Sequence, residues 1–436
     1  MIALPPFHTA LTPSYRALRD KKEAGIAIAN RSINRHKRRA KTMKVLLLPT
    51  SGFSQGSMYP FKHYADELKT RYKIETTEIV SDDLKEKIQS IKDFDGDLIL
   101  FSVPWDFGTE GVLDFAIEAN REKKQAKLVL FDYLDGNESR FWAVMPHIDL
   151  YLKQYLHRDM KKYQQQFTGA SEFIQYQVDS GRIENTIQEE VWTNLFQSKL
   201  DKKQYRKVML GWNFGLWGRL IQLAEGNASR VLWAKDRPDK RLVTLAKRAL
   251  DSVRAAVGGE SEPIDIYCRA TLYKGWTKAH RMEVIESLNQ MPDRYNVISS
   301  IKKVGFSEYY REMQQSKIFV SPSGWCEYTP KDYEAMYFGA LLIKPCVEHI
   351  DTHPNILIPN ETYVAVKWDL SDLNEKCEYY LENPIERKRI TDNAKKAFVG
   401  YFEQKLFVEK IDEVLQKLDI HPEKTNEYAK PLRVAD

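Results

Sequence analysis

The side chains best placed for binding chemistry lie in the stretch 319–345, where an apolar segment leads into Ser321–Gly324. A loop of such small residues lets a ligand approach the backbone closely. Thr329 is a good helix N-cap, Pro330 suits the first helical position, and Asp332 completes a capping-box pattern. The spacing therefore predicts a helix from Pro330. Its unpaired N–H groups and positive dipole end would face the loop and could hold an anion.

Two charged side chains on this predicted helix extend the anion site. Lys331 lies in the first turn, where a mobile ammonium group suits a phosphate. Glu334 follows one turn later, and its carboxylate can accept two hydrogen bonds from vicinal hydroxyls of a ribose or another sugar. These residue types predict binding of a phosphate beside sugar hydroxyls. A surface carboxylate is the alternative for Glu334.

A second set of acidic residues follows the apolar stretch 126–133. Asp132, Asp135 and Glu138 would lie at the carboxyl end of a buried strand, where α/β proteins place polar site residues. Each could take a proton from a substrate hydroxyl, and we favour Asp135. Two alternatives stay open for this Asp-Gly-Asn segment, ordinary turn chemistry and a metal site.

Short apolar runs alternate with helical patterns along most of the chain, which indicates βαβ units and parallel sheets. The first series has strands near 44–48, 72–79, 97–103 and 126–133. The second series has strands near 263–269, 295–299, 317–321, 340–344 and 362–366. The segment 370–418 is helical in pattern.

Aromatic residues are concentrated in the middle of the chain, in a segment whose pattern is mostly helical. The segment 149–204 contains Tyr151, Tyr155, Tyr163, Phe167, Phe173, Tyr176 and Trp192. We expect most of them to pack over the first sheet. The alternative is a wall that faces a bound sugar, because aromatic faces stack on sugar rings. The aromatic and glycine-rich stretch Gly211–Gly218 could line a cleft, form an interdomain hinge or simply pack.

The sequence from Glu334 to Ile343, Glu-Ala-Met-Tyr-Phe-Gly-Ala-Leu-Leu-Ile, resembles the E-A-x-x-x-G-x-x-(V/I) signature of GT-B glycosyltransferases. As in that family, it follows a strand and a Ser-Pro-Ser-Gly loop, and the pattern is most similar to exostosin-like and spore-coat-type members. The resemblance implies that Glu334 binds the donor ribose and Lys331 the diphosphate. It further implies a donor set that includes Ser323, Gly324, Thr329 and Arg269.

The resemblance has further implications for the site. Gly52 and Ser54 would belong to a loop that faces the cleft, and Arg269 could instead form a structural ion pair. A helix dipole and basic side chains would neutralise the diphosphate, so no metal and no other cofactor are expected. Many retaining members carry a glutamate eight positions before the second one, where this chain has Cys326. Glu327, one residue later, is the remaining acid and a candidate catalytic group.

The implied fold class is α/β of the GT-B type, with two facing Rossmann-like domains, a helical insertion and C-terminal helices. We expect a basic extension at 1–42, an acceptor domain at 43–230, a nucleotide-sugar-binding domain at 231–420 and a tail at 421–436. The implied activity is hexosyl or pentosyl transfer from a nucleotide sugar to a glycan or polysaccharide acceptor.

Charge and composition place limits on partners and location. Ten basic and two acidic residues precede Met43, so the net charge of +5 resides in this extension and not in the body. We expect a solvated arm, with contact to nucleic acid or to an anionic membrane surface as alternatives. The four cysteines show no metal-binding spacing, no signal peptide is evident and no long apolar run occurs, which favours a cytoplasmic protein.

Two other functions would account for part of the sequence. A sugar-nucleotide epimerase or hydrolase of the same fold would turn over the donor without an acceptor. A nucleic-acid-binding protein would use the basic extension, but no recognisable nucleic-acid-binding motif accompanies it, and we expect no nucleic-acid partner.

Overall fold

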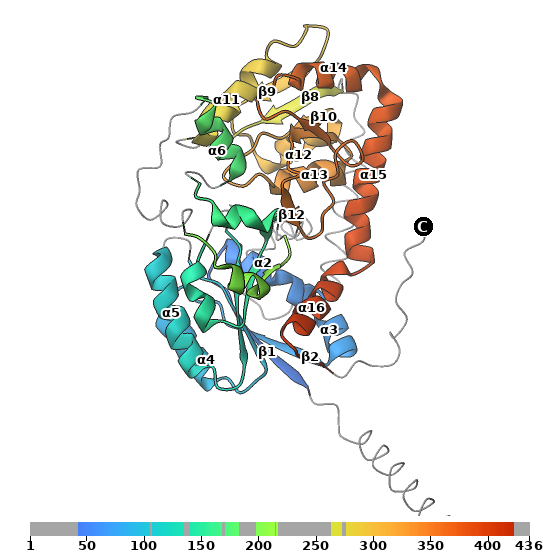
Figure 1. Cartoon of the computed structure of the whole chain (residues 1–436). Helices are drawn as coiled ribbons and strands as arrows, with labels where there is room; N and C mark the ends of the chain where they lie inside the picture. Colours follow the sequence, from blue (N-terminus) through green and yellow to red (C-terminus); the bar gives the residue numbers. More distant parts are fainter. Residues whose placement is uncertain are drawn as a thin grey trace, which may run out of the picture.

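The computed structural model describes residues 42–104, 107–134, 140–167, 171–182, 198–213, 215–216, 263–272 and 276–422. Almost all of the extension at 1–42 and of the tail at 421–436 therefore lies outside the described residues. The described part contains two parallel sheets, one in each half of the molecule (Figure 1).

The first sheet has six parallel strands in the order β2-β1-β3-β4-β5-β7. Alternate residues of β1 enter two different cores, because successive side chains of a strand point to opposite faces. Val45 and Leu47 pack on the side of α2, α3 and α16, whereas Leu46 and Leu48 pack on the side of α4 and α5. The elements are β1 (Met43–Leu48), α2 (Phe53–His63), α3 (Ala65–Tyr72), β2 (Ile74–Glu78), α4 (Leu84–Asp93), β3 (Leu98–Phe101), α5 (Gly108–Glu122), β4 (Lys127–Asp132), β5 (Leu150–Lys153) and β7 (Val208–Leu210).

The second sheet has five parallel strands in the order β13-β11-β10-β8-β9. One face packs against α11 and α14 through residues such as Ile266 and Ile343, and the other packs against α12, α13 and α15 through Tyr267 and Phe319. The elements are β8 (Ile264–Arg269), α11 (Trp276–Leu288), β9 (Val297–Ser300), α12 (Phe306–Gln315), β10 (Ser316–Val320), α13 (Pro330–Phe338), β11 (Leu341–Pro345), β13 (Val364–Val366), α14 (Leu373–Glu382) and α15 (Pro384–Glu403).

Both sheets follow one strand order. Their first strand pairs with the second on one side and with the third on the other, so β1 lies beside β3, and β8 lies beside β10. The chain segments that follow the two strands of such a pair cross to opposite faces of the sheet. A crevice therefore opens between them at the carboxyl ends of the two strands. We call these the first crevice, after β1 and β3, and the second crevice, after β8 and β10.

The last helix returns the chain to the first sheet. α15 runs along one side of the molecule from the second sheet, and α16 (Leu406–Lys417) then lies beside α3 (Figure 1). The ring of Phe407 on α16 contacts Phe61 and Trp212 edge-on, with ring centroids 5.2 and 5.1 Å apart. Although 406–417 falls within the predicted range 231–420, this helix packs on the first half.

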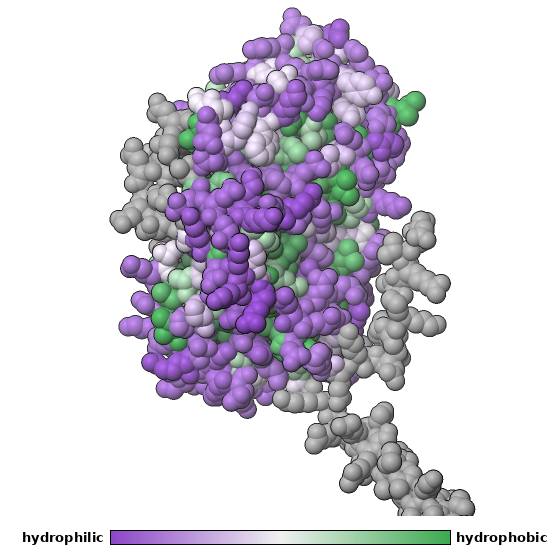
Figure 2. All heavy atoms as spheres, viewed as in Figure 1, coloured by the Kyte–Doolittle hydropathy of each residue, from purple (hydrophilic) through white to green (hydrophobic). Residues whose placement is uncertain are grey.

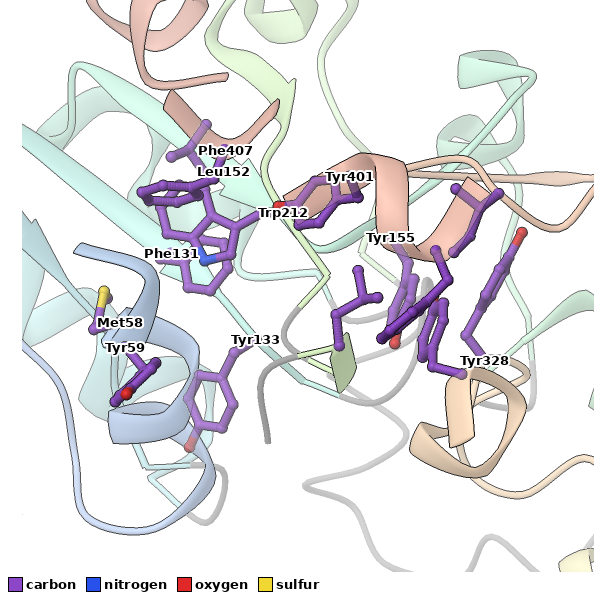
Figure 3. Close-up of a cluster of buried hydrophobic side chains, with 14 of the residues drawn as sticks. Met58, Tyr59, Phe131, Tyr133, Leu152, Tyr155, Trp212, Tyr328, Tyr401 and Phe407 are labelled. Carbon is purple, nitrogen blue, oxygen red and sulfur yellow. The ribbon is translucent and has the colours of Figure 1, made fainter. Parts of the chain in front are cut away.

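Polar and aromatic contacts join the two halves where the carboxyl ends of their strands face each other. β6 (Tyr155–His157) pairs antiparallel with β12 (Ile350–Thr352). The amide of Asn213 donates to the hydroxyls of Tyr333 and Thr352, over 2.5 and 3.2 Å. Tyr155 stacks on Tyr328 with centroids 5.5 Å apart, and Figure 3 shows this pair near the cluster of Trp212, Phe131 and Phe407. In the described part of the stretch Gly211–Gly218, Trp212 thus belongs to the core and Asn213 joins the two halves.

The structure confirms the α/β architecture of two parallel, Rossmann-like sheets with C-terminal helices. It corrects the mostly helical prediction for 149–204, because Leu150–Lys153 and Tyr155–His157 are strands. Four consecutive buried residues are too short a run for a buried helix, and here they complete a parallel sheet. In the described part of this range, the helical pieces are η2 (Met160–Gln164), α6 (Glu172–Asp179) and η3 (Lys202–Lys207). Most of the listed aromatic residues are buried as expected, Tyr176 is half-buried, and Trp192 lies outside the described residues.

The face of the molecule in Figure 2 is mostly hydrophilic, and its hydrophobic residues form separate small patches. Among the residues that the structure describes, no helix combines the length and the apolar character needed to cross a membrane.

Candidate functional site

The second crevice brings together the loop Ser321–Gly324, the end of β8 and the start of α13. Thr329 begins α13 as predicted: its backbone N–H donates to Asp332 over 2.8 Å, and its hydroxyl donates to the same carboxylate over 3.1 Å. Asp332 is fully buried and also accepts from Ser321 (2.6 Å) and from the ammonium group of Lys344 (2.5 Å). This network fixes the helix start against β10 and β11.

Two cationic side chains bond to backbone carbonyls around the end of β8. The ammonium group of Lys331 donates to the carbonyl of Arg269 over 2.9 Å. Arg281, on the second turn of α11, donates to the carbonyl of Thr271 and, over 3.3 Å, to that of Ser323. The crevice is therefore lined by positive charge at the position where the dipole of α13 adds to it.

The guanidinium group of Arg269 is held by an acidic partner. Two of its nitrogens donate to Glu312 over 2.6 and 2.7 Å, and a third donates to the carbonyl of Lys302 over 3.1 Å. This bidentate geometry is the structural ion pair that was the alternative for Arg269. Arg269 is thus held in an ion pair, whereas Lys331 and Arg281 place their cationic groups on backbone carbonyls of the crevice.

Glu334 lies one turn after Lys331, with its side chain fully buried. Its Oε1 accepts a hydrogen bond from the hydroxyl of Tyr310 on α12 over 3.2 Å.

Ser323 and Gly324 lie against α11. The backbone N–H of Ser323 donates to Nε2 of His280 over 3.3 Å. Burial, together with the charges of Arg281 and Arg182, lowers the pKa of His280 to about 3, so the ring is neutral and its Nδ1 carries the hydrogen. Among the described residues, this Nδ1 and the Ser323 hydroxyl are both buried without a hydrogen-bond partner. Such polar atoms are available to a ligand.

Glu327 lies three residues after Gly324 and is paired with a histidine. Its Oε1 is 3.1 Å from Nε2 of His349, and its Oε2 is buried without a partner among the described residues. Burial opposes the charge of His349, but the carboxylates of Glu327 and Glu172 outweigh it and raise the pKa of His349 above its ordinary value. The pair can therefore hold or move a proton beside the loop.

The sequence did not single out Arg281 or the Glu327–His349 pair as a unit. Arg281 contacts carbonyls 10 and 42 positions away, and the Glu327–His349 contact joins residues 22 apart. No motif signals such contacts, although the position of Arg281 on the helix after β8 was a usable hint.

The first crevice contains the predicted Gly52 and Ser54. Gly52 has a φ of 72° and precedes α2. The hydroxyl of Ser54 accepts from the N–H of Thr50 over 2.9 Å and shares a short hydrogen bond with Ser102. Ser51 donates from its N–H and its hydroxyl to Asp82, over 2.8 and 2.6 Å. The polar groups here satisfy one another around a carboxylate.

Comparison with known proteins bears on the second crevice. Residues 237–405 match a family model described as glycosyl transferase-like. The match includes the whole second sheet and all of Arg269, Arg281, Lys331 and Glu334. No curated protein matches the sequence.

Several solved structures are similar over most of the chain. A glycosyltransferase from Rickettsia africae is 12% identical, with 87% of this chain and 99% of that chain covered and a TM-score of 0.45. Sucrose-phosphate synthase from Thermosynechococcus elongatus is 12% identical, with 86% and 99% covered and a TM-score of 0.41. A UDP-GlcNAc 2-epimerase from Neisseria meningitidis is 12% identical, with 85% and 100% covered and a TM-score of 0.38.

The candidate bases of the first half lie outside the matched residues 237–405. Asp132 is buried at the end of β4, where it accepts from Lys153 (2.5 Å), Tyr151 (2.8 Å) and the N–H of Leu134 (3.2 Å). These contacts favour a structural role for Asp132. Asp135 and Glu138 lie outside the described residues. The described residues contain no group of three or more metal-ligating side chains.

Proposed function

We propose that this protein is a glycosyltransferase that binds a nucleotide-sugar donor in the second crevice and transfers the sugar to a glycan acceptor. The observation that carries the proposal is that Lys331 and Arg281 bond to the carbonyls of Arg269 and Thr271, at and just after the end of β8. This position is at the carboxyl ends of β8 and β10, where the strand order of the second sheet reverses. Both strands belong to the residues that match the glycosyl transferase-like family model.

The donor roles follow from charge and position. Lys331, Arg281 and the N-terminus of α13 would neutralise the diphosphate, while Ser323 and Gly324 would offer their loop backbone and the Ser323 hydroxyl. Glu334 would accept hydrogen bonds from the ribose hydroxyls. Thr329 would act by fixing the start of α13. With these cations in place, we expect the diphosphate to be bound without a metal ion.

The reaction needs a group that accepts the proton of the acceptor hydroxyl. The bond from the sugar C1 to the diphosphate oxygen breaks, a bond from C1 to the acceptor oxygen forms, and the hydroxyl proton must leave. Glu327 is the best-placed described carboxylate, because it is buried beside the loop and backed by His349. Asp135 stays a predicted alternative from the first half.

Nucleotide binding tests this proposal directly. UDP, GDP, CDP and dTDP would each be added to the full chain and thermal unfolding recorded. A nucleotide at about one hundred times its Kd should stabilise the fold by about 2.7 kcal/mol. Glu334→Gln, which keeps the side-chain size, should abolish most of that response. Glu382→Gln on the exposed side of α14 serves as the matched control.

The outcomes separate the proposal from its alternatives. If no nucleotide stabilises the folded wild type, the nucleotide-sugar proposal fails. If one nucleotide does, its sugar derivatives are supplied with and without an acceptor. Turnover that needs no acceptor would identify an epimerase or hydrolase instead.

A further inference from the structure

A groove lies between the first-half segment η2–α6 and the loop after β13 (beside α6 in Figure 1). Its volume is about 630 Å³, enough for a few sugar rings. Three aromatic rings line it, together with amide, hydroxyl and charged side chains: Lys162, Gln165, Gln166, Phe167, Glu172, Gln175, Tyr176, Asp179, Ser180 and Trp368. The groove thus takes its walls from both halves of the chain.

The charges of the groove disfavour an anionic ligand. It is lined by one lysine and two carboxylates, and Lys162 is already paired with Glu172 over 2.9 Å. Burial opposes ionisation of Glu172, but hydrogen bonds from His157 and Lys162 prevail and lower the pKa of Glu172 to about 2. A phosphate would meet an ionised carboxylate there. Neutral hydroxyl groups, by contrast, can donate to the carboxylates and bond to the amides.

The aromatic wall of the groove is held in a fixed orientation. The indole N–H of Trp368 donates to the carbonyl of Cys346 over 2.8 Å, and Gln177 donates to the Trp368 carbonyl over 2.9 Å. Tyr176 meets the Trp368 ring edge-on, with centroids 5.3 Å apart. Pre-oriented rings of this kind suit the apolar faces of sugar rings, because little ordering is left to occur on binding.

The groove is also close to the candidate catalytic carboxylate. The ring of Trp368 lies 5.0 Å from that of His349, centroid to centroid, and His349 is hydrogen-bonded to Glu327. Two side chains therefore separate the groove from the carboxylate beside the loop of the second crevice.

We infer that this groove binds the acceptor as a neutral oligosaccharide, with Tyr176 and Trp368 as stacking surfaces. The inference rests on the proposed glycosyltransferase function and assigns the acceptor's chemical class and place. The donor, which carries a diphosphate, binds elsewhere, at the cations of the second crevice.

The test uses the full-length wild type and three variants on an array of neutral, sulfated, phosphorylated and sialylated oligosaccharides. Tyr176→Ala and Trp368→Phe change the groove, and Tyr379→Ala changes an exposed tyrosine on α14 as the matched control. We expect the wild type and the control to bind neutral oligosaccharides, with binding reduced at least tenfold in Tyr176→Ala and less in Trp368→Phe. Thermal stabilisation by the nucleotide should be the same in all four proteins.

Three results would overturn the inference. These are wild-type binding only to acidic glycans, no binding to any glycan, and unchanged binding in both groove variants. The nucleotide measurement distinguishes this failure from failure of the proposed function. A wild type that no nucleotide stabilises would contradict donor binding, which is the proposed function, whereas a wild type that responds to a nucleotide but gives one of these three results would contradict only the inference about the groove. Loss of the nucleotide response in Tyr176→Ala would show a general loss of structure, and Trp368→Phe then decides the outcome.

Discussion

The two crevices share one topology and differ in charge. Each lies where the first strand of its sheet pairs with the third, β1 with β3 and β8 with β10. In the first crevice, Ser51 binds the carboxylate of Asp82, and Lys87 is buried with its ammonium group on the carbonyls of Leu48 (3.1 Å) and Ser102 (2.8 Å). The polar groups there bind one another.

The second crevice is arranged for a ligand instead. Lys331 and Arg281 bring positive charge to its edge, and buried polar atoms of Ser323 and His280 lack a partner among the described residues. Topology thus supplies two equivalent crevices, and the side chains decide which one can hold an anion. The predictions below test that division, beginning with the largest effect.

Lys153→Met should cause the largest loss of stability. The variant would leave the Asp132 carboxylate buried without its cationic partner at the carboxyl end of the first sheet, which typically costs about 3–5 kcal/mol. Urea unfolding measures the change. Lys127→Met, which removes a half-exposed partner of Asp149, is the control and should cost less than about 1 kcal/mol. Equal stabilities for the two variants would contradict a structural role for the Asp132–Lys153 pair.

The pH dependence of stability should differ between the crevices. Burial lowers the pKa of His280 to about 3 and that of Lys87 to about 7. As the pH falls, each side chain takes up a proton in the unfolded chain at a higher pH than in the folded protein. Stability therefore falls as the pH decreases from about 6.5 toward 3 for His280, and from about 10.5 toward 7 for Lys87.

Variants at each crevice should flatten separate parts of the pH profile. His280→Gln should remove up to about 1.4 kcal/mol per pH unit from the acidic slope, and Lys87→Met should act only on the alkaline slope. Urea unfolding at intervals of one pH unit measures both, with the exposed His421→Gln as control. An acidic slope that survives in His280→Gln would mean that this ring is not the buried neutral group described above.

Local patterns in the sequence predicted much of this molecule. The strand series followed from short apolar runs, and the start of α13 followed from the spacing of Thr329 and Asp332, because an N-cap is a contact across three residues. β5 escaped prediction, since four residues hold too little periodicity to distinguish a strand from a helix. A sugar-stacking role was open for the aromatic segment 149–204, but the contacts of Arg281 and the part of Trp368 in the groove depend on distant segments. The sequence offers no local signal for such contacts.

The smallest predicted effects come from one substitution made in both crevices, glycine to alanine. At Gly324 a Cβ would lie 2.5 Å from a terminal nitrogen of Arg281. That nitrogen is the tip of a flexible side chain, so the guanidinium can move aside at little cost to stability. Its displacement should weaken binding of the stabilising nucleotide about tenfold, or about 1.4 kcal/mol, measured by isothermal titration.

At Gly52 the same substitution should affect stability and not binding. A Cβ there would contact nothing within 4 Å, but the φ of 72° lies in the left-handed region, where alanine costs about 1–2 kcal/mol. Gly52→Ala should therefore unfold at a lower urea concentration while keeping the wild-type Kd for the nucleotide, the reverse of Gly324→Ala. A weaker Kd in Gly52→Ala would mean that the first crevice also contacts the donor. In that case the side-chain charges of the two crevices would not explain which one binds the nucleotide.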